Sequence, residues 1–283
     1  MLTVLAPAKL NLVLEVVGRH DQYHDIRSIA QGIDLCDMLT FEPATDISFT
    51  CSEPSLLKDN LVSQAARLLQ EHCAILQGAR IHLNKRIPQA AGLGGGSSDA
   101  AATLLALNQM WGAGLQQHQL FDLAAQLGSD VPLFVTGGTV LLKDKGDQVR
   151  ALPHHPPMHA VILTPCAYPP PGKTGLMYSQ LHPEMFTKGQ FVRAAEFALE
   201  HGRRIPEELM FNVFEKVADC VFESLARDRT LLQKATDVPV HLAGSGPSLY
   251  VLLPSADEAD AVASRLIRYG RHAVVARTIG PAA

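Results

Sequence analysis

Residues 87–102 read IPQAAGLGGGSSDAAA, and this stretch decides the fold. Four glycines between positions 92 and 96 permit positive φ angles and close backbone approach, so successive amide N–H groups can point into one concavity that suits phosphate. The run at 97–111 is rich in helix formers, so the glycines end at a helix N-terminus whose free N–H groups add to the anion site. Ser97 and Ser98 can cap that helix or donate to phosphate oxygens.

Other interpretations of glycine-rich segments can be checked against the residues. A tight strand-to-helix connection, in which glycines serve only backbone geometry, stays open. A dinucleotide-binding fingerprint starting at Gly92 fails because its sixth position is Ser97. The segment PPPGKT at 169–174 resembles the tail of a nucleotide P-loop, but the required upstream glycine is Ala167 and three prolines remove cradling N–H groups.

Outward from the loop, the pattern of apolar residues predicts an α+β protein of two domains. Prolines at 153, 156 and 157 mark the boundary, which divides the chain into domains 1–152 and 153–283. A polar turn is expected at 18–26, and a buried strand directly after Asp130. The other expected elements are strands at 10–17, 79–83, 137–144, 160–164 and near 240 and 250, and helices at 60–71, 97–111, 117–127, 191–201, 208–226 and 257–269.

Composition limits the class of protein. The 283 residues are 47% hydrophobic with a formal charge of -4, and they contain no apolar run long enough to span a membrane. The N-terminal stretch has Lys9 and Asn11 where a secretion signal would be apolar. We therefore expect a soluble, cytoplasmic protein with no electrostatic footprint for nucleic acid or membrane. Both a monomer and a homodimer are possible.

The cysteines and histidines suggest no metal centre. Five cysteines without CxxC spacing are expected to be reduced and mostly buried. His154, His155 and His159 form a cluster that could bind a metal, but without a carboxylate or cysteine partner a solvated interdomain linker is the favoured interpretation. The metal ligands therefore stay unknown at this stage.

Two charged residues stand out as candidates for phosphoryl-transfer chemistry, which needs a group to orient or deprotonate the acceptor and positive charge for the transition state. Asp130 lies in GSDVP, directly after a predicted helix. There it either takes part in the phosphoryl transfer or caps a turn. Lys9 enters a β-prone run, and burying it costs desolvation unless it has a partner, for which Asp130 is the type expected.

The ordered motifs of the chain resemble those of the GHMP kinases, which act on small molecules. They are PAKLNL at 7–12, YH at 23–24, DNL at 59–61, KRIP at 85–88, AGLGGGSSDAAA at 91–102, GSDVPLF at 128–134 and GSGPSLY at 244–250. The resemblance implies a ribosomal-protein-S5-like N-terminal domain that binds ATP and a ferredoxin-like C-terminal domain that binds substrate. PAKLNL with the paired YH is closest to the branch that acts on a cytidine diphosphate-linked methylerythritol in the non-mevalonate isoprenoid pathway.

The resemblance also implies roles for individual residues, with ATP and Mg²⁺ as cofactors. Lys9 and Asp130 are the catalytic pair, with Asp130 as base toward the 2-hydroxyl of the acceptor. The ATP-binding residues are Asn60, Lys85, Pro88, Gln89, Ala90, Ala91, Gly92, Leu93, Gly94, Gly95, Gly96, Ser97 and Ser98. The substrate-binding residues are Asn11, Tyr23, His24, Thr174, Tyr178, Gly244, Ser245 and Gly246.

Among these, His24 is expected to hydrogen-bond the cytosine edge, and Tyr23 and Tyr178 to stack on its two faces. Asp99 is expected to point away from phosphate or to hold Mg²⁺ through water. The GSGPS segment is either a turn that closes on the loop or a substrate contact. The family usually has a glycine before YH, where this chain has Gln22. Alternatives left open are a related kinase for homoserine or mevalonate and a non-catalytic ATP sensor.

Overall fold

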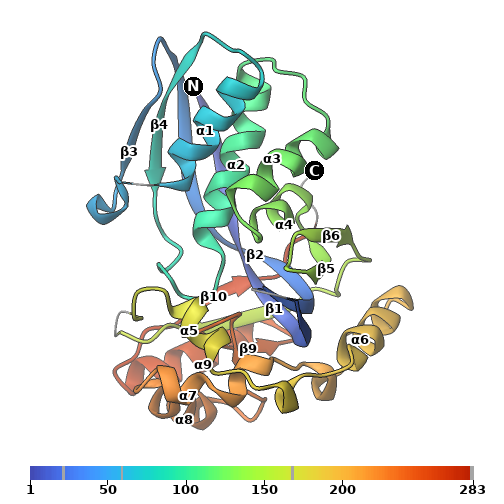
Figure 1. Cartoon of the computed structure of the whole chain (residues 1–283). Coiled ribbons are helices and arrows are strands. Elements are labelled where there is room, and N and C mark those ends of the chain that lie inside the picture. Colours follow the sequence, from blue (N-terminus) through green and yellow to red (C-terminus); the bar gives the residue numbers. More distant parts are fainter. Residues whose placement is uncertain (21–22, 59, 167–168, 281–283) are drawn as a thin grey trace. The chain divides into compact units, whose positions relative to one another are not determined.

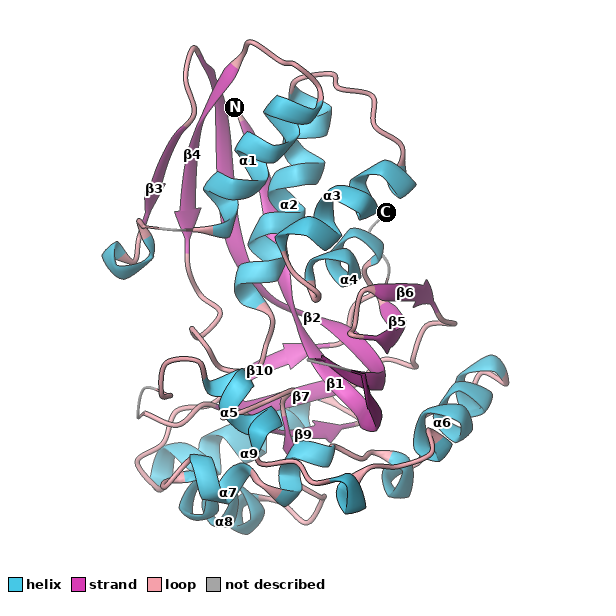
Figure 2. Cartoon of the chain, viewed as in Figure 1, coloured by secondary structure: helices cyan, strands magenta, loops and turns pink. Residues whose placement is uncertain are grey.

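The computed structural model describes residues 1–20, 23–58, 60–166 and 169–280. The chain mixes helices and strands throughout, as an α+β protein does (Figure 2). It divides into two compact units built from discontinuous segments. Unit 1 contains residues 1–8, 35–89 and 94–137, and unit 2 contains residues 9–34, 90–93 and 138–283.

The two longest strands contribute residues to both units. They are β1 (Leu2–His20) and β2 (Tyr23–Ala44). The compact units therefore do not follow a single cut of the chain, and the division at residue 152 stays a prediction about domains. Gln22, which departs from the family pattern, lies outside the described residues.

Unit 1 places helices beside a sheet (Figure 1). The second half of β2 pairs with β4 (Gly78–Asn84) antiparallel, and β3 (Ser48–Cys51) pairs with β4 parallel. The helices are α1 (Leu61–His72), α2 (Gly95–Met110), α3 (Gln117–Leu127) and α4 (Val131–Thr136). α2 packs against the other three, and its buried alanines let them approach closely.

Unit 2 contains two groups of paired strands. The first half of β2 pairs with β5 (Thr139–Asp144), which pairs with β6 (Gln148–Ala151). A separate antiparallel sheet has the order β10-β7-β9-β8, and α9 packs on it. The strands of this sheet are β7 (His159–Leu163), β8 (His241–Leu242), β9 (Leu249–Leu253) and β10 (Val274–Arg277). The helices of unit 2 are α5 (Lys173–Ser179), α6 (Gln190–Glu200), α7 (Ala218–Val221), α8 (Leu225–Ala235) and α9 (Ala256–Arg268).

Most elements predicted from the sequence are confirmed, and three are wrong. The polar turn expected at 18–26 is wrong for its described residues, because β1 continues to His20 and β2 begins at Tyr23. The segment after Asp130 is helix α4 rather than a strand, because Pro132 fits the first turn of a helix and Gly137 follows its end. The single helix expected at 208–226 is instead two 3-10 turns and the short α7. Asn212 interrupts the expected helix, because its side chain accepts from Phe214 N and donates to Leu242 O and Gly244 O.

Two expectations about buried side chains are also wrong. None of the five cysteines is fully buried, although all lie in the described part and none forms a disulfide. His155 is not a solvated linker residue but is 3% exposed, and its Nε2 accepts from Ile205 N at 3.3 Å. Burial lowers the pKa of His155, so the ring is neutral. Across the described ranges, no helix has the length and apolar character needed to cross a membrane.

Candidate active site

Lys9 on β1 is anchored to the middle of the glycine loop within unit 2. Its backbone N–H donates to Leu93 O at 3.0 Å, and its Nζ donates to Gly92 O at 3.0 Å. The same Nζ donates to Asn11 Oδ1 at 2.6 Å, and the lysine is only 5% exposed. Burial of an ammonium group is costly unless hydrogen bonds orient it, and here two oxygen acceptors direct it toward the loop.

Asn11 is itself held in one orientation. Its Nδ2 donates to Ser28 Oγ at 2.8 Å, and that hydroxyl donates to Val13 O at 2.6 Å. Tyr250 OH donates to Asn11 O at 2.9 Å. The amide oxygen of Asn11 therefore faces Lys9, and Ser28 supports that arrangement although no local sequence signal marked it.

The GSGPS segment is a turn that closes on the glycine loop. Gly92 has φ +84, and a Cβ there would lie 2.0 Å from Ala243 O. A Cβ on Gly244 would lie 2.9 Å from Lys9 Nζ. Ser248 N donates to Ala91 O at 3.2 Å. The turn role is thus confirmed, and direct substrate contact by residues 244–246 stays a prediction.

A second polar group lies where α5 begins. Thr174 Oγ1 is 3.2 Å from Ser245 Oγ, to which Lys173 Nζ donates at 3.0 Å. Lys173 Nζ also donates to Gly246 O, and the residue is 8% exposed. Thr174 and Ser245 therefore lie together, with the buried Lys173 beside them, and contact of Thr174 and Ser245 with substrate stays a prediction.

Aromatic side chains gather around His24 in unit 2. The ring of His24 stacks on Tyr178 with centroids 4.8 Å apart, and the edge of Phe186 meets it at 5.9 Å. Tyr178 in turn packs edge-on against Phe214 at 4.9 Å. Burial and then Arg19 lower the pKa of His24, so its ring is neutral at pH 7.

The two tyrosines of the predicted cytosine site differ in setting. Tyr23 is 63% exposed, and Lys145 Nζ lies 5.9 Å from its ring centroid. Tyr178 packs against the core of unit 2. One face of the Tyr178 ring carries His24 in this structure, and stacking of cytosine on Tyr178 stays a prediction.

In unit 1 the loop ends at α2, whose N-cap is Gly94 with φ +75. The helix starts before the serines, so the expectation that Ser97 or Ser98 caps it is wrong. Gly94 takes the left-handed conformation that only glycine adopts readily, and Ser98 N donates to Gly94 O at 2.9 Å. Ser98 Oγ is buried with no hydrogen-bond partner.

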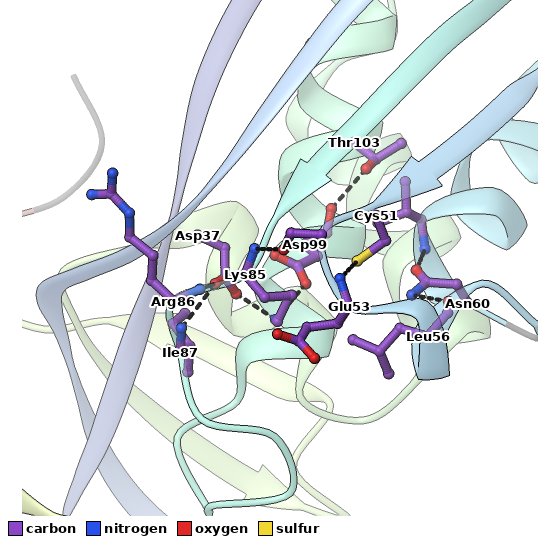
Figure 3. A network of polar contacts seen from close by, with 12 residues as sticks. Asp37, Cys51, Glu53, Leu56, Asn60, Lys85, Arg86, Ile87, Asp99 and Thr103 are labelled. Carbon is purple, nitrogen blue, oxygen red and sulfur yellow. Dashed lines mark hydrogen bonds and ion pairs between the residues drawn. The ribbon is translucent and has the colours of Figure 1, made fainter.

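A buried ion cluster borders the loop (Figure 3). Lys85 Nζ donates to Asp99 Oδ2 at 2.8 Å and also pairs with Asp37. Asp99 Oδ2 is engaged by Lys85, and the two alternatives for Asp99, pointing away from phosphate or holding Mg²⁺ through water, stay predictions. Asn60 is the N-cap of α1, with Oδ1 accepting from Val62 N at 2.8 Å. Contact of Lys85 and Asn60 with ATP stays a prediction.

Burial and the neighbouring charges shift the pKa values of Lys85 and Asp99. Burial of Asp99 raises its pKa from 3.8 to about 7, with Asp37 adding to the rise and Lys85 opposing it. Burial lowers the pKa of Lys85, but the two carboxylates outweigh that effect, so its net shift is upward. Lys85 therefore stays charged at pH 7, whereas the raised pKa of Asp99 lies close to that pH.

The raised pKa of Asp99 should make the free energy of unfolding depend on pH. Because the pKa of Asp99 is higher in the folded state than in the unfolded state, its favourable contribution is complete below pH 4 and is lost as pH rises to about 7. Asp99→Asn should abolish that loss, so unfolding free energies at pH 5 and pH 8 should differ less in the variant than in the wild type. Denaturant titrations at both pH values measure this, and equal differences in variant and wild type would contradict it. Asp122→Asn, an exposed change on α3, is the control.

Asp130 lies just before α4, in unit 1. It is half-buried, and its side chain makes no cap hydrogen bond to the helix. The choice for Asp130 between a role in the chemistry and a cap for the turn therefore stays a prediction. Lys9 belongs to unit 2, and the pairing of Lys9 with Asp130 stays a prediction.

Comparisons with known proteins agree with one family across the chain. The family models "GHMP kinases N terminal domain" and "GHMP kinases C terminal" match residues 60–138 and 194–272. A 4-diphosphocytidyl-2-C-methyl-D-erythritol kinase of Dehalococcoides mccartyi is 41% identical over 283 residues, covering 99% of both chains. One of Pelotomaculum thermopropionicum is 38% identical over 287 residues, with 99% of both covered.

Solved structures give the same result. A crystal structure of 4-(cytidine 5'-diphospho)-2C-methyl-D-erythritol kinase matches with a TM-score of 0.84 and 35% identity, covering 99% of this chain and 100% of the other. A homoserine kinase from Cytophaga hutchinsonii matches with a TM-score of 0.77 at 19% identity, covering 99% of this chain and 94% of that one. The second match concerns the fold alone.

Proposed function

Because the chain belongs to the 4-diphosphocytidyl-2-C-methyl-D-erythritol kinase family of GHMP kinases, we propose that it transfers the γ-phosphate of ATP to the 2-hydroxyl of that cytidyl substrate. The product would serve isoprenoid precursor biosynthesis by the non-mevalonate route. The observation that carries the proposal is Lys9 Nζ bound to Gly92 O, because it ties a buried cation to the glycine loop.

The loop is proposed to bind the phosphates of ATP. Gly92 and Gly94 have positive φ angles, and the loop leads into the N-terminus of α2. Backbone N–H groups of such a turn, with the positive end of the helix dipole, favour anions without a lysine in the loop. The glycine at 92 is also required by space, because Ala243 O occupies the position of a Cβ.

The transfer itself is assigned to Asp130 and Lys9. The acceptor hydroxyl oxygen forms a bond to the γ-phosphorus, the bond from that phosphorus to ADP breaks, and the hydroxyl proton passes to the Asp130 carboxylate. The Lys9 ammonium stabilises negative charge on the transferring group. Asn11 keeps this ammonium in place through the 2.6 Å hydrogen bond.

Mg²⁺ is proposed to enter with ATP. This ion usually keeps several waters and is held by substrate phosphates with few protein oxygens, and it neutralises charge on the β- and γ-phosphates. Ser97 offers a hydroxyl oxygen in the first turn of α2. Asp99 is less suited, because its Oδ2 accepts from Lys85.

The cytidyl group is assigned to the aromatic cluster of His24, Tyr178 and Phe186. A neutral imidazole has one donor and one acceptor nitrogen, which suits the hydrogen-bonding edge of cytosine. The flat face of Tyr178 supplies stacking, worth about 1 to 3 kcal/mol per base. Tyr23 is exposed and can close over the other face of the base.

An ADP-release assay tests this function. The cytidyl-methylerythritol diphosphate should be phosphorylated, whereas mevalonate and homoserine should give only background. Tyr178→Ala should raise KM for the cytidyl substrate about 5- to 150-fold, the equivalent of the stacking energy, with KM for ATP unchanged.

Two controls accompany the assay. Tyr178→Phe keeps the ring and should retain most of the wild-type KM, and Tyr269→Ala removes an exposed tyrosine at the end of α9. Turnover of mevalonate or homoserine in preference to the cytidyl substrate would show that the enzyme acts on a different alcohol from the one proposed. No ADP release with any of the three, despite ATP binding, would favour the non-catalytic sensor.

A further inference from the structure

Asp37 on β2 holds the chain where it enters the glycine loop. Its Oδ1 accepts from Arg86 N at 2.5 Å and from Ile87 N at 2.9 Å, and its Oδ2 pairs with Lys85 (Figure 3). The side chain is completely buried. One carboxylate thus takes hydrogen bonds from three successive residues, the last of which directly precedes the loop at 88–98.

Lys85 connects this entry to the exit of the loop. Its Nζ donates to Asp99 Oδ2 at 2.8 Å, and Asp99 lies in α2 just after the two loop serines. Gly95, the first residue of α2, packs on the same group, because a Cβ there would lie 3.0 Å from Ile87 Cγ2 and 3.2 Å from Lys85 Nζ. Entry and exit are therefore joined through one ammonium group.

Stability alone is a weak reason for such a cluster. Desolvation of buried charges commonly offsets their attraction, and apolar residues of similar size often stabilise a protein as well. Charge-assisted hydrogen bonds, however, are short and directional, so they fix geometry better than apolar packing does. A loop that binds phosphate through backbone N–H groups needs its ends held in a fixed relation.

We propose that Asp37 is a positioning residue for ATP, which sets the spacing between the two ends of the glycine loop through Lys85 and Asp99. This inference rests on the proposed function, because it takes residues 88–98 as the phosphate site. Asp37 does not touch the nucleotide. Its carboxylate accepts hydrogen bonds from the N–H groups of Arg86 and Ile87. These bonds fix the direction in which the chain continues from β4 into the loop.

Calorimetric binding of two probes tests the proposal with the full chain. The probes are the imido analogue of ATP, which is not hydrolysed, and CDP, whose proposed site uses unit 2 residues. Asp37→Asn keeps the shape but loses the charge and one acceptor, so the Kd for the ATP analogue should rise about 10- to 100-fold. The Kd for CDP should stay within about twofold of wild type. Asp122→Asn should change neither.

Asp99→Asn is the second variant, used whether or not Asp37→Asn folds. It removes the negative charge that pairs with Lys85 at the start of α2, while Asp37 keeps its three partners. It should therefore also raise the Kd for the ATP analogue and leave the Kd for CDP unchanged. Parallel weakening of both probes would overturn the proposal, because it would indicate a general loss of structure. An unchanged Kd for the ATP analogue in both variants would overturn it too. If wild type bound CDP but not the ATP analogue, the assignment of the loop itself would fail.

Discussion

Asp130→Asn is expected to lower kcat by about 10²- to 10⁴-fold, which is the usual contribution of a general base. Asparagine has nearly the same shape but cannot accept the hydroxyl proton. Asp130 makes no cap hydrogen bond to α4 that the change would break, so the fold should be preserved. Single-turnover kinetics with saturating ATP measure the effect on the chemical step.

Ser129→Ala is the matched control for this change, because Ser129 is the exposed neighbour of Asp130. It should leave kcat near the wild-type value. The Kd for the ATP analogue should be similar in Asp130→Asn and wild type, since the defect is expected in the transition state. Undiminished turnover in Asp130→Asn would remove this residue from the mechanism.

Lys9→Met should lower kcat about 10²- to 10³-fold, the range observed when one donor to a developing charge is removed. Methionine fills the buried space of the lysine stem but carries no charge. Asn11 Oδ1 and Gly92 O would both lose their donor, so some loss of thermal stability is expected as well. Comparison of kcat with KM for each substrate measures the catalytic part.

Lys143→Met provides the control for removing a lysine from a strand, because Lys143 is exposed on β5. It should change neither kcat nor KM. A Lys9→Met enzyme with normal kcat and raised KM for ATP would contradict the assignment and place Lys9 in ground-state binding. Melting temperature would separate that result from unfolding.

Local sequence was sufficient where short-range preferences govern the structure. The helix predicted at 117–127 is α3, and the helix predicted at 60–71 is α1 with Asn60 as its cap. Prediction failed where neighbouring residues favour different secondary structures. The segment after Asp130 has β-prone residues, but Pro132 and the following turn made it a helix.

Site residues divide in the same way. The glycine loop was found because backbone conformation and helix initiation are local properties, and the structure gives Gly92 and Gly94 the positive φ angles that this requires. Asp37 was missed because a single aspartate in a mixed strand has no local signature. Its partner Lys85 is 48 positions away.

The amino-acid sequence by itself determined the family, the α+β class, the glycine loop and the candidates Lys9, Asp130, His24 and Tyr178. These follow from residue types at short spacing, which set turns, helix starts and the chemistry available. Only the tertiary structure decided that Lys9 binds Gly92 O, that the GSGPS turn closes on the loop and that Lys85 joins the two carboxylates. The physical reason is that such pairs form between distant residues, where packing removes water and leaves each buried charge only the partners that the fold brings to it.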